Sequence, residues 1–175
     1  MFPDGQRHDV TEIDLLLDHA RAFGPVAASV GVMSYHFPNG VGQSTLELHA
    51  GVALPDVLLA PSLTLIADVD EIGGMYASAG MRHGFALGEH FALDLRGALG
   101  WVSSDQAEDY FFSESGGLAD ALVAADLSYA LSERSRLTLT LAQSVLIDSA
   151  LRDGVEGVGI DPTPTWVAFS LGWTL

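Results

Sequence analysis

The sequence contains no cysteine and no lysine. Without thiolates the chain cannot form a disulfide, a cysteine-ligated zinc site or a thiol redox centre. Its 7 basic residues, all arginine, stand against 23 acidic residues, which gives a formal net charge of −16. Because a nucleic-acid backbone requires a basic protein surface, we expect no nucleic-acid partner.

Long apolar runs are missing as well. The most apolar window, residues 50–67, contains Pro55, Asp56 and Pro61, whereas a membrane-spanning helix needs about 20 apolar residues with few interruptions. Residues 1–9 have neither an apolar stretch nor a small-residue cleavage site, so they predict no signal peptide. Nevertheless 49% of the residues are hydrophobic and only 17% are charged. This apolar content must be accommodated without a transmembrane helix.

Alternation of bulky apolar residues with small or polar ones is the dominant pattern, and it predicts β-strands. The final segment is the clearest case, with an apolar face made of Val167, Phe169, Leu171, Trp173 and Leu175. Seven further segments alternate in the same way and begin near residues 26, 45, 62, 75, 91, 120 and 137. The pattern predicts an all-β chain, and its length predicts a single domain over residues 1–175.

Residues 11–22 have two interpretations. In a strand, Ile13, Leu15 and Leu17 would share the lipid-facing side, and the acidic residues of the segment would join the lumen, namely Glu12, Asp14 and Asp18. In a helix, Ile13, Leu16, Leu17 and Ala20 would form an apolar stripe. We favour a ninth strand, because its alternation matches that of the other eight segments.

The connections between the segments alternate in length. Short ones fall near residues 23–25, 55–56, 88–90 and 132–135, and long ones near residues 37–43, 69–74, 103–117 and 148–162. This rhythm is typical of an antiparallel up-and-down transmembrane β-barrel, which has short periplasmic turns and long external loops.

The composition of the polar faces indicates which side would meet lipid. They combine Gly, Ala, Ser and Thr with scattered Asp and Arg, whereas the exterior of a soluble barrel carries long Lys, Glu and Arg side chains. Aromatic residues of the apolar faces lie near the strand ends, as expected for lipid-interface aromatics. These residues are Phe85, Phe91, Trp101, Tyr129 and Trp173.

The terminal strand from Val167 to Leu175, together with the rhythm of the connections, resembles bacterial outer-membrane β-barrels of a small, porin-like type. The segments Tyr35 to Gly40 and Asp68 to Glu71 share this character, and the resemblance covers most of residues 11–175. It implies a cell outer membrane location in a Gram-negative bacterium. It also implies contact with outer-membrane lipid and recognition of the C-terminal strand by the barrel-assembly machinery. Because such barrels have an even number of strands, nine strands predict an N-terminally truncated chain whose parent has ten or more.

Polar-face residues with ionisable side chains are the candidates for lining the lumen. They could select solutes by charge, as rings of charge do in pores. In the favoured alternative, Arg82 and Arg96 pair with neighbouring acids and fill a narrow interior. The lumen-lining candidates are Glu47, His49, Asp68, Asp70, Tyr76, Arg82, Asp94, Arg96, Asp120 and Asp126.

No cofactor or metal site is expected. Two acidic groups have the oxygen ligands that Ca²⁺ prefers, but neither has the spacing of a twelve-residue calcium loop, and a solvated surface is the favoured interpretation. These groups are Asp68, Asp70 and Glu71, and Asp105, Glu108 and Asp109.

The function expected from these features is that of a porin-like or structural outer-membrane barrel that passes small solutes, if it passes any. One alternative is a soluble up-and-down barrel that binds an apolar ligand. Another is a lipid-modifying enzyme that uses His49 and Glu47 with Ser44 or Ser78, or the outward-facing His83. No nucleophile motif stands out, so we expect no enzyme.

Overall fold

The computed structural model describes residues 10, 12–38 and 43–173. These residues form nine strands and two helices. The strands are β1 (Ile13–Phe23), β2 (Val26–His36), β3 (Thr45–Ala53), β4 (Ser62–Asp68), β5 (Met75–Ala86), β6 (Phe91–Val102), β7 (Gly117–Ala130), β8 (Ser135–Leu146) and β9 (Thr165–Trp173). The helices are α1 (Ser104–Phe111) and α2 (Ser149–Gly157). Leu175, the last member of the apolar face predicted for the final strand, lies outside the described residues.

All nine strands belong to one sheet, in the order β1 to β9, and each is antiparallel to its neighbours. The all-β, up-and-down prediction is therefore confirmed. The first segment is a strand, since β1 pairs with β2 from Ile13 opposite His36 to Phe23 opposite Val26. The helical interpretation of residues 11–22 is wrong.

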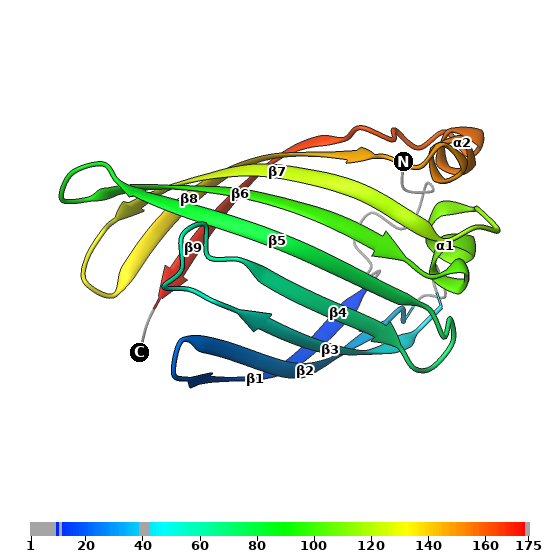
Figure 1. Cartoon of the computed structure of the whole chain (residues 1–175), viewed down its shortest axis with the longest axis horizontal. Coiled ribbons are helices and arrows are strands. Elements are labelled where there is room, and N and C mark those ends of the chain that lie inside the picture. Colours follow the sequence, from blue (N-terminus) through cyan, green and yellow to red (C-terminus); the bar gives the residue numbers. More distant parts are fainter. Residues whose placement is uncertain (1–9, 11, 39–42, 174–175) are drawn as a thin grey trace.

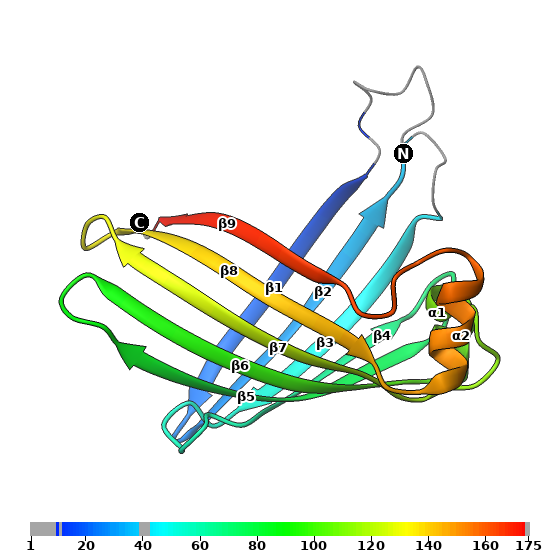
Figure 2. The same ribbon diagram turned by 90° about the horizontal axis from the view of Figure 1, so that it is seen from above.

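The sheet twists and curls strongly along its length (Figures 1 and 2). We call the end with the connections β1–β2, β3–β4, β5–β6 and β7–β8 the turn end, and the opposite end the loop end. Both helices lie at the loop end (Figure 1). The two edge strands, β1 and β9, are paired on one side only within the described part of the chain.

The connection at Pro55 and Asp56 is longer than predicted. It runs from the end of β3 to Ser62, and the Leu54 N–H donates to the carbonyl of Pro61 at 2.9 Å. The Leu59 carbonyl accepts a hydrogen bond from the N–H of Arg82 in β5 at 2.8 Å. The connection therefore lies beside β5, where it continues the pairing of β4 with that strand. Pro55 and Asp56 mark a turn correctly, but pairing with β5 extends the segment beyond it.

Two of the long connections contain helices that strand periodicity does not reveal. Ser103 caps α1 by accepting from the N–H of Gln106, and Asp148 caps α2 by accepting from the N–H groups of Ala150 and Leu151. The helices pack against the loop end of the sheet and bury an apolar cluster there. The cluster consists of Val102, Ala107, Ala119, Leu146, Leu151 and Val155.

The two faces of the sheet differ in exposure. Bulky residues on the apolar face project into the surroundings, so that Leu17 is 72% and Phe169 is 74% exposed. From β3 to β8, most residues of the polar face are buried or half-buried. Neither helix in the described part of the chain combines the length and apolarity that crossing a membrane requires.

Candidate functional site

The candidate site is the polar face of the sheet. The pairing register places Met33 and Asp68 beside Glu47, and Asp126 beside Asp94. Paired residues in neighbouring strands point to the same side, so the lumen-lining candidates located in strands share one face. Asp70 is the exception, because it lies in the connection after β4 and is exposed.

Several of these side chains meet across strands. His49 Nε2 lies 2.6 Å from Asp18 Oδ2, and the pair bridges β3 and β1 over the intervening strand β2. Tyr76 donates its hydroxyl to Asp120 Oδ1 at 3.0 Å, which joins β5 and β7 over β6. Both bridges are possible because the strand between carries a glycine. A Cβ atom at Gly31 would contact the His49 ring, and one at Gly100 would contact both Asp120 and Tyr76.

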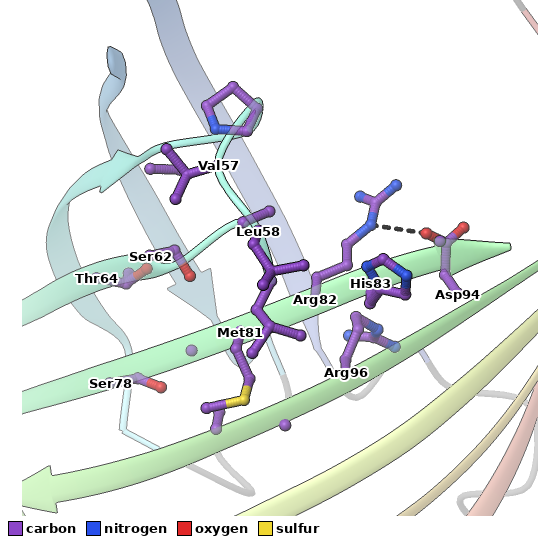
Figure 3. Close-up of a pocket in the computed structure, with 18 of the residues that line it drawn as sticks. Val57, Leu58, Ser62, Thr64, Ser78, Met81, Arg82, His83, Asp94 and Arg96 are labelled. Carbon is purple, nitrogen blue, oxygen red and sulfur yellow. Dashed lines mark hydrogen bonds and ion pairs between the residues drawn. The ribbon is translucent and has the colours of Figure 1, made fainter. Parts of the chain in front are cut away.

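A cavity of about 710 Å³ lies at the turn end, and we call it the arginine cavity (Figure 3). Its lining includes Arg82, Arg96 and the hydroxyl-bearing residues Ser62, Thr64 and Ser78. The connection between β3 and β4 forms one wall, where Val57 and Leu58 are drawn in Figure 3.

Both arginines of the arginine cavity are paired with carboxylates. Arg82 Nε donates to Asp94 Oδ1 at 2.8 Å. Arg96 makes two hydrogen bonds to Asp126, with Nε 2.6 Å from Oδ2 and Nη2 3.1 Å from Oδ1. Thr140 also donates to Asp126, at 2.6 Å. These bonds neutralise the guanidinium groups locally and fix their orientation.

A second cavity, of about 560 Å³, lies at the loop end, and we call it the tyrosine–carboxylate cavity. Its polar lining comes from β2, β3, β5, helix α1 and the connections beside them. Tyr35 donates to Glu47 Oε2 at 3.1 Å, and Gln43 donates to Glu71 Oε2 at 2.5 Å. The polar lining residues are Glu12, Tyr35, Gln43, Thr45, Glu47, Glu71, Tyr76, Gln106, Asp109 and Tyr110.

Tyr110 presents a neutral phenol to this cavity. Burial raises its pKa, and the nearby carboxylates of Glu47 and Asp68 raise it further. A phenol whose pKa is raised stays protonated at neutral pH and can donate a hydrogen bond. Helix α1 therefore contributes a hydrogen-bond donor, and not a further negative charge, at this position.

Asp68 orders the wall of the tyrosine–carboxylate cavity. Its buried carboxylate accepts from the Thr45 hydroxyl at 2.5 Å and from the N–H groups of Asp70, Ile72 and Gly73 at 3.0 to 3.3 Å. These bonds hold the connection between β4 and β5 in place. Asp68 was predicted to line the lumen; in the structure its carboxylate is engaged by these four hydrogen bonds, and it is not among the lining residues of either cavity.

The residues of the enzyme alternative are not brought together as a catalytic triad in the described part of the chain. His49 is hydrogen-bonded to Asp18, whereas the Ser44 hydroxyl lies 3.3 Å from Nδ1 of a different histidine, His36. Over the described residues, no group of three His, Asp or Glu side chains is placed to hold a metal ion.

The predicted interface aromatics lie on the apolar face and are all partly exposed. At the turn end, the rings of Phe91 and Tyr129 pack with their centroids 4.8 Å apart. Trp101 lies towards the loop end, on the opposite side of the apolar band.

Sequence reasoning placed Asp18 on the polar face through the strand interpretation, but it missed three residues that shape the site: Tyr35, Gln106 and Tyr110. Tyr35 could have been found, because it follows the alternation of β2 on the polar face. Helix α1 could have been found from Ser103 and Gln106, which have the spacing of a capping box. The partner of Asp18 depends on a reach across β2 that no local pattern contains.

No family model matches the chain, and no curated protein is similar enough to count as a relative.

Proposed function

We propose that this chain is an outer-membrane β-barrel protein, porin-like or structural, whose apolar face contacts lipid and whose polar face lines the interior. One observation carries the proposal: large apolar side chains are exposed along one face of the whole sheet, while the ion pairs Arg82–Asp94 and Arg96–Asp126 lie on the other. Monomeric soluble proteins seldom expose apolar patches beyond about 600 Å². In a bilayer these side chains would contact lipid hydrocarbon and would not be exposed to water.

The aromatic residues support the same orientation. Phe91 and Tyr129 at the turn end and Trp101 towards the loop end border the apolar band. Amphipathic rings favour the interfaces between lipid hydrocarbon and water. The acidic α1 and the other long connections would then lie in water at the external side.

The alternative of a soluble barrel with an apolar ligand is less well supported. Such a barrel needs an apolar interior, yet Arg96, Asp126 and Thr140 form a hydrogen-bonded group on the inner face. The exposed apolar face would also remain in water without a covering surface.

Barrel closure sets a requirement on the two edge strands. Unpaired backbone groups in hydrocarbon cost several kcal/mol each, so the proposal requires β1 and β9 to be paired in the membrane. Strand direction alternates along the sheet, so β1 and β9 run in the same direction. Direct pairing between them would be parallel, and an all-antiparallel barrel needs a further strand between them.

The proposal is tested by refolding the purified chain into detergent micelles and lipid vesicles. We expect it to require detergent for solubility and to change its electrophoretic mobility on boiling, as folded barrels do. Swelling of the vesicles in small sugars separates a porin-like protein from a structural one. A chain that remains monomeric in plain buffer with the same strand content would overturn the proposal.

A further inference from the structure

We propose that the tyrosine–carboxylate cavity binds an elongated organic dication of the aliphatic diamine or polyamine class. The inference rests on the proposed function only in that it names a ligand for the proposed outer-membrane protein. The site itself is built from described residues, so its binding can be measured on detergent-solubilised protein, separately from any passage through a membrane.

The charged residues that line the cavity are all acidic. Four carboxylates line it, from Glu12, Glu47, Glu71 and Asp109, and no arginine or histidine is among its described lining residues. Glu47 and Glu71 have only neutral hydrogen-bond partners, namely the Tyr35 hydroxyl and the Gln43 amide. A cation would therefore provide the missing opposite charge.

Gln106 gives independent evidence for a ligand. Gln106 is only 8% exposed and lines the cavity. Its side-chain amide nevertheless has no hydrogen-bond partner among the described residues. Buried polar groups are nearly always hydrogen-bonded. The usual partner of a glutamine in a capping box is the N–H of the capping residue, but the Ser103 N–H donates to the carbonyl of Met75 instead. The Gln106 amide is left available to a bound molecule.

The distribution of the carboxylates favours an extended cation over a metal ion. No three acidic or histidine side chains in the described ranges are placed to hold one metal, so the carboxylates surround the cavity at separate points. Ammonium groups separated by methylene units can reach such points, each with its own charge-assisted hydrogen bonds. A volume of about 560 Å³ is within the range of small-molecule sites, roughly 300–1,000 Å³.

Aromatic rings complete the recognition surface. Tyr35, Tyr76 and Tyr110 line the cavity from β2, β5 and α1. Aromatic faces attract ammonium groups and pack against methylene chains. The combination of carboxylates, phenols and a free carboxamide fits a primary amine better than an anion or a neutral sugar.

The test is calorimetric titration of the detergent-solubilised chain with putrescine and spermidine. An ionic strength of about 0.15 M limits attraction by distant exposed acids. We expect saturable binding that is tighter for spermidine, no binding of the neutral analogue 1,4-butanediol, and no displacement by equimolar Mg²⁺. Gln106→Leu and Glu47→Gln should each raise Kd about ten-fold or more, because the first removes a hydrogen-bond acceptor for an ammonium group and the second removes a negative charge beside it.

Glu108→Gln is the matched control, because Glu108 is an exposed acid of α1 that does not line the cavity. Its Kd should equal that of the wild type. Equal weakening by Glu108→Gln and Glu47→Gln, or displacement of spermidine by Mg²⁺, would mean general attraction to an acidic surface and would overturn the inference. Absence of binding in a protein that still shows barrel-like mobility would refute the inference and leave the proposed function standing. Far-UV circular dichroism of each variant separates a binding defect from misfolding.

Discussion

His49 of β3 is hydrogen-bonded to Asp18 of β1, with 2.6 Å between Nε2 and Oδ2, across the full width of β2. The bridge passes directly over Gly31, where any Cβ atom would contact the His49 ring and approach the carbonyl oxygen of Leu17. The bridge ties the edge strand β1 to the third strand of the sheet. A single glycine in β2 thus leaves room for a side-chain contact between the first and third strands.

We expect Gly31→Ala to lower the free energy of unfolding by about 1–3 kcal/mol, the usual cost of inserting an atom where there is no space. The measurement is denaturant unfolding in detergent. Gly97→Ala is the matched control, because its Cβ atom would have no neighbour closer than 3.8 Å. Its effect should stay within about 1 kcal/mol of zero. Equal effects of the two substitutions would contradict the role assigned to Gly31.

The second prediction concerns Arg96 and Asp126. Arg96→Met leaves the Asp126 carboxylate with Thr140 as its remaining described partner, and we expect a destabilisation of about 1–3 kcal/mol. We expect a smaller destabilisation than for a fully buried ion pair, because the Arg96 side chain is 38% exposed. Arg82→Met should cost only about 0–1 kcal/mol, because the Arg82 side chain is 62% exposed. Urea midpoints of both variants check the ranking, and a larger loss for Arg82→Met would refute it.

The strands could be predicted from the sequence because each carries its own evidence. A period of two residues appears in every strand, and it follows from the requirement that one face be apolar. By this criterion even the ambiguous first segment is a strand, as β1 (Ile13–Phe23) is in the structure. The length of the connection after β3 could not be predicted in this way, because its pairing with Arg82 of β5 is a tertiary contact.

The site was less accessible to sequence reasoning. The polar face could be listed residue by residue, since it is the other half of the same alternation. Its partners could not, because bridges such as Tyr76 to Asp120 depend on register and on a glycine in the strand between. The contribution of α1 depends on a short helix held by contacts with the sheet, and strand periodicity has no signal for it.

The third prediction tests how α1 is anchored. The Ser103 hydroxyl accepts hydrogen bonds from the N–H of Gln106 at 3.3 Å and from the N–H of Met75 in β5 at 2.9 Å. Ser103→Ala removes both, and we expect a loss of about 1–2 kcal/mol, as for other helix caps. Ser104→Ala, at an exposed position in the first turn, should have little effect. Thermal unfolding compares the two, and an equal loss for both would show that the cap does not anchor the helix.

The fourth prediction distinguishes a lipid-facing surface from a water-facing one. Leu65 and Thr64 are neighbours in β4 whose side chains lie on opposite faces, Leu65 on the exposed apolar face and Thr64 in the lining of the arginine cavity. A lysine on the lipid face near the membrane midplane costs about 2–4 kcal/mol. We therefore expect Leu65→Lys to reduce insertion into vesicles strongly, and Thr64→Lys, whose ammonium group can reach the aqueous interior, to insert nearly as well as the wild type. Co-flotation with vesicles measures both. If Leu65→Lys were instead more soluble and equally well folded in plain buffer, the apolar face would be exposed to water or covered by protein, and the membrane orientation would be wrong.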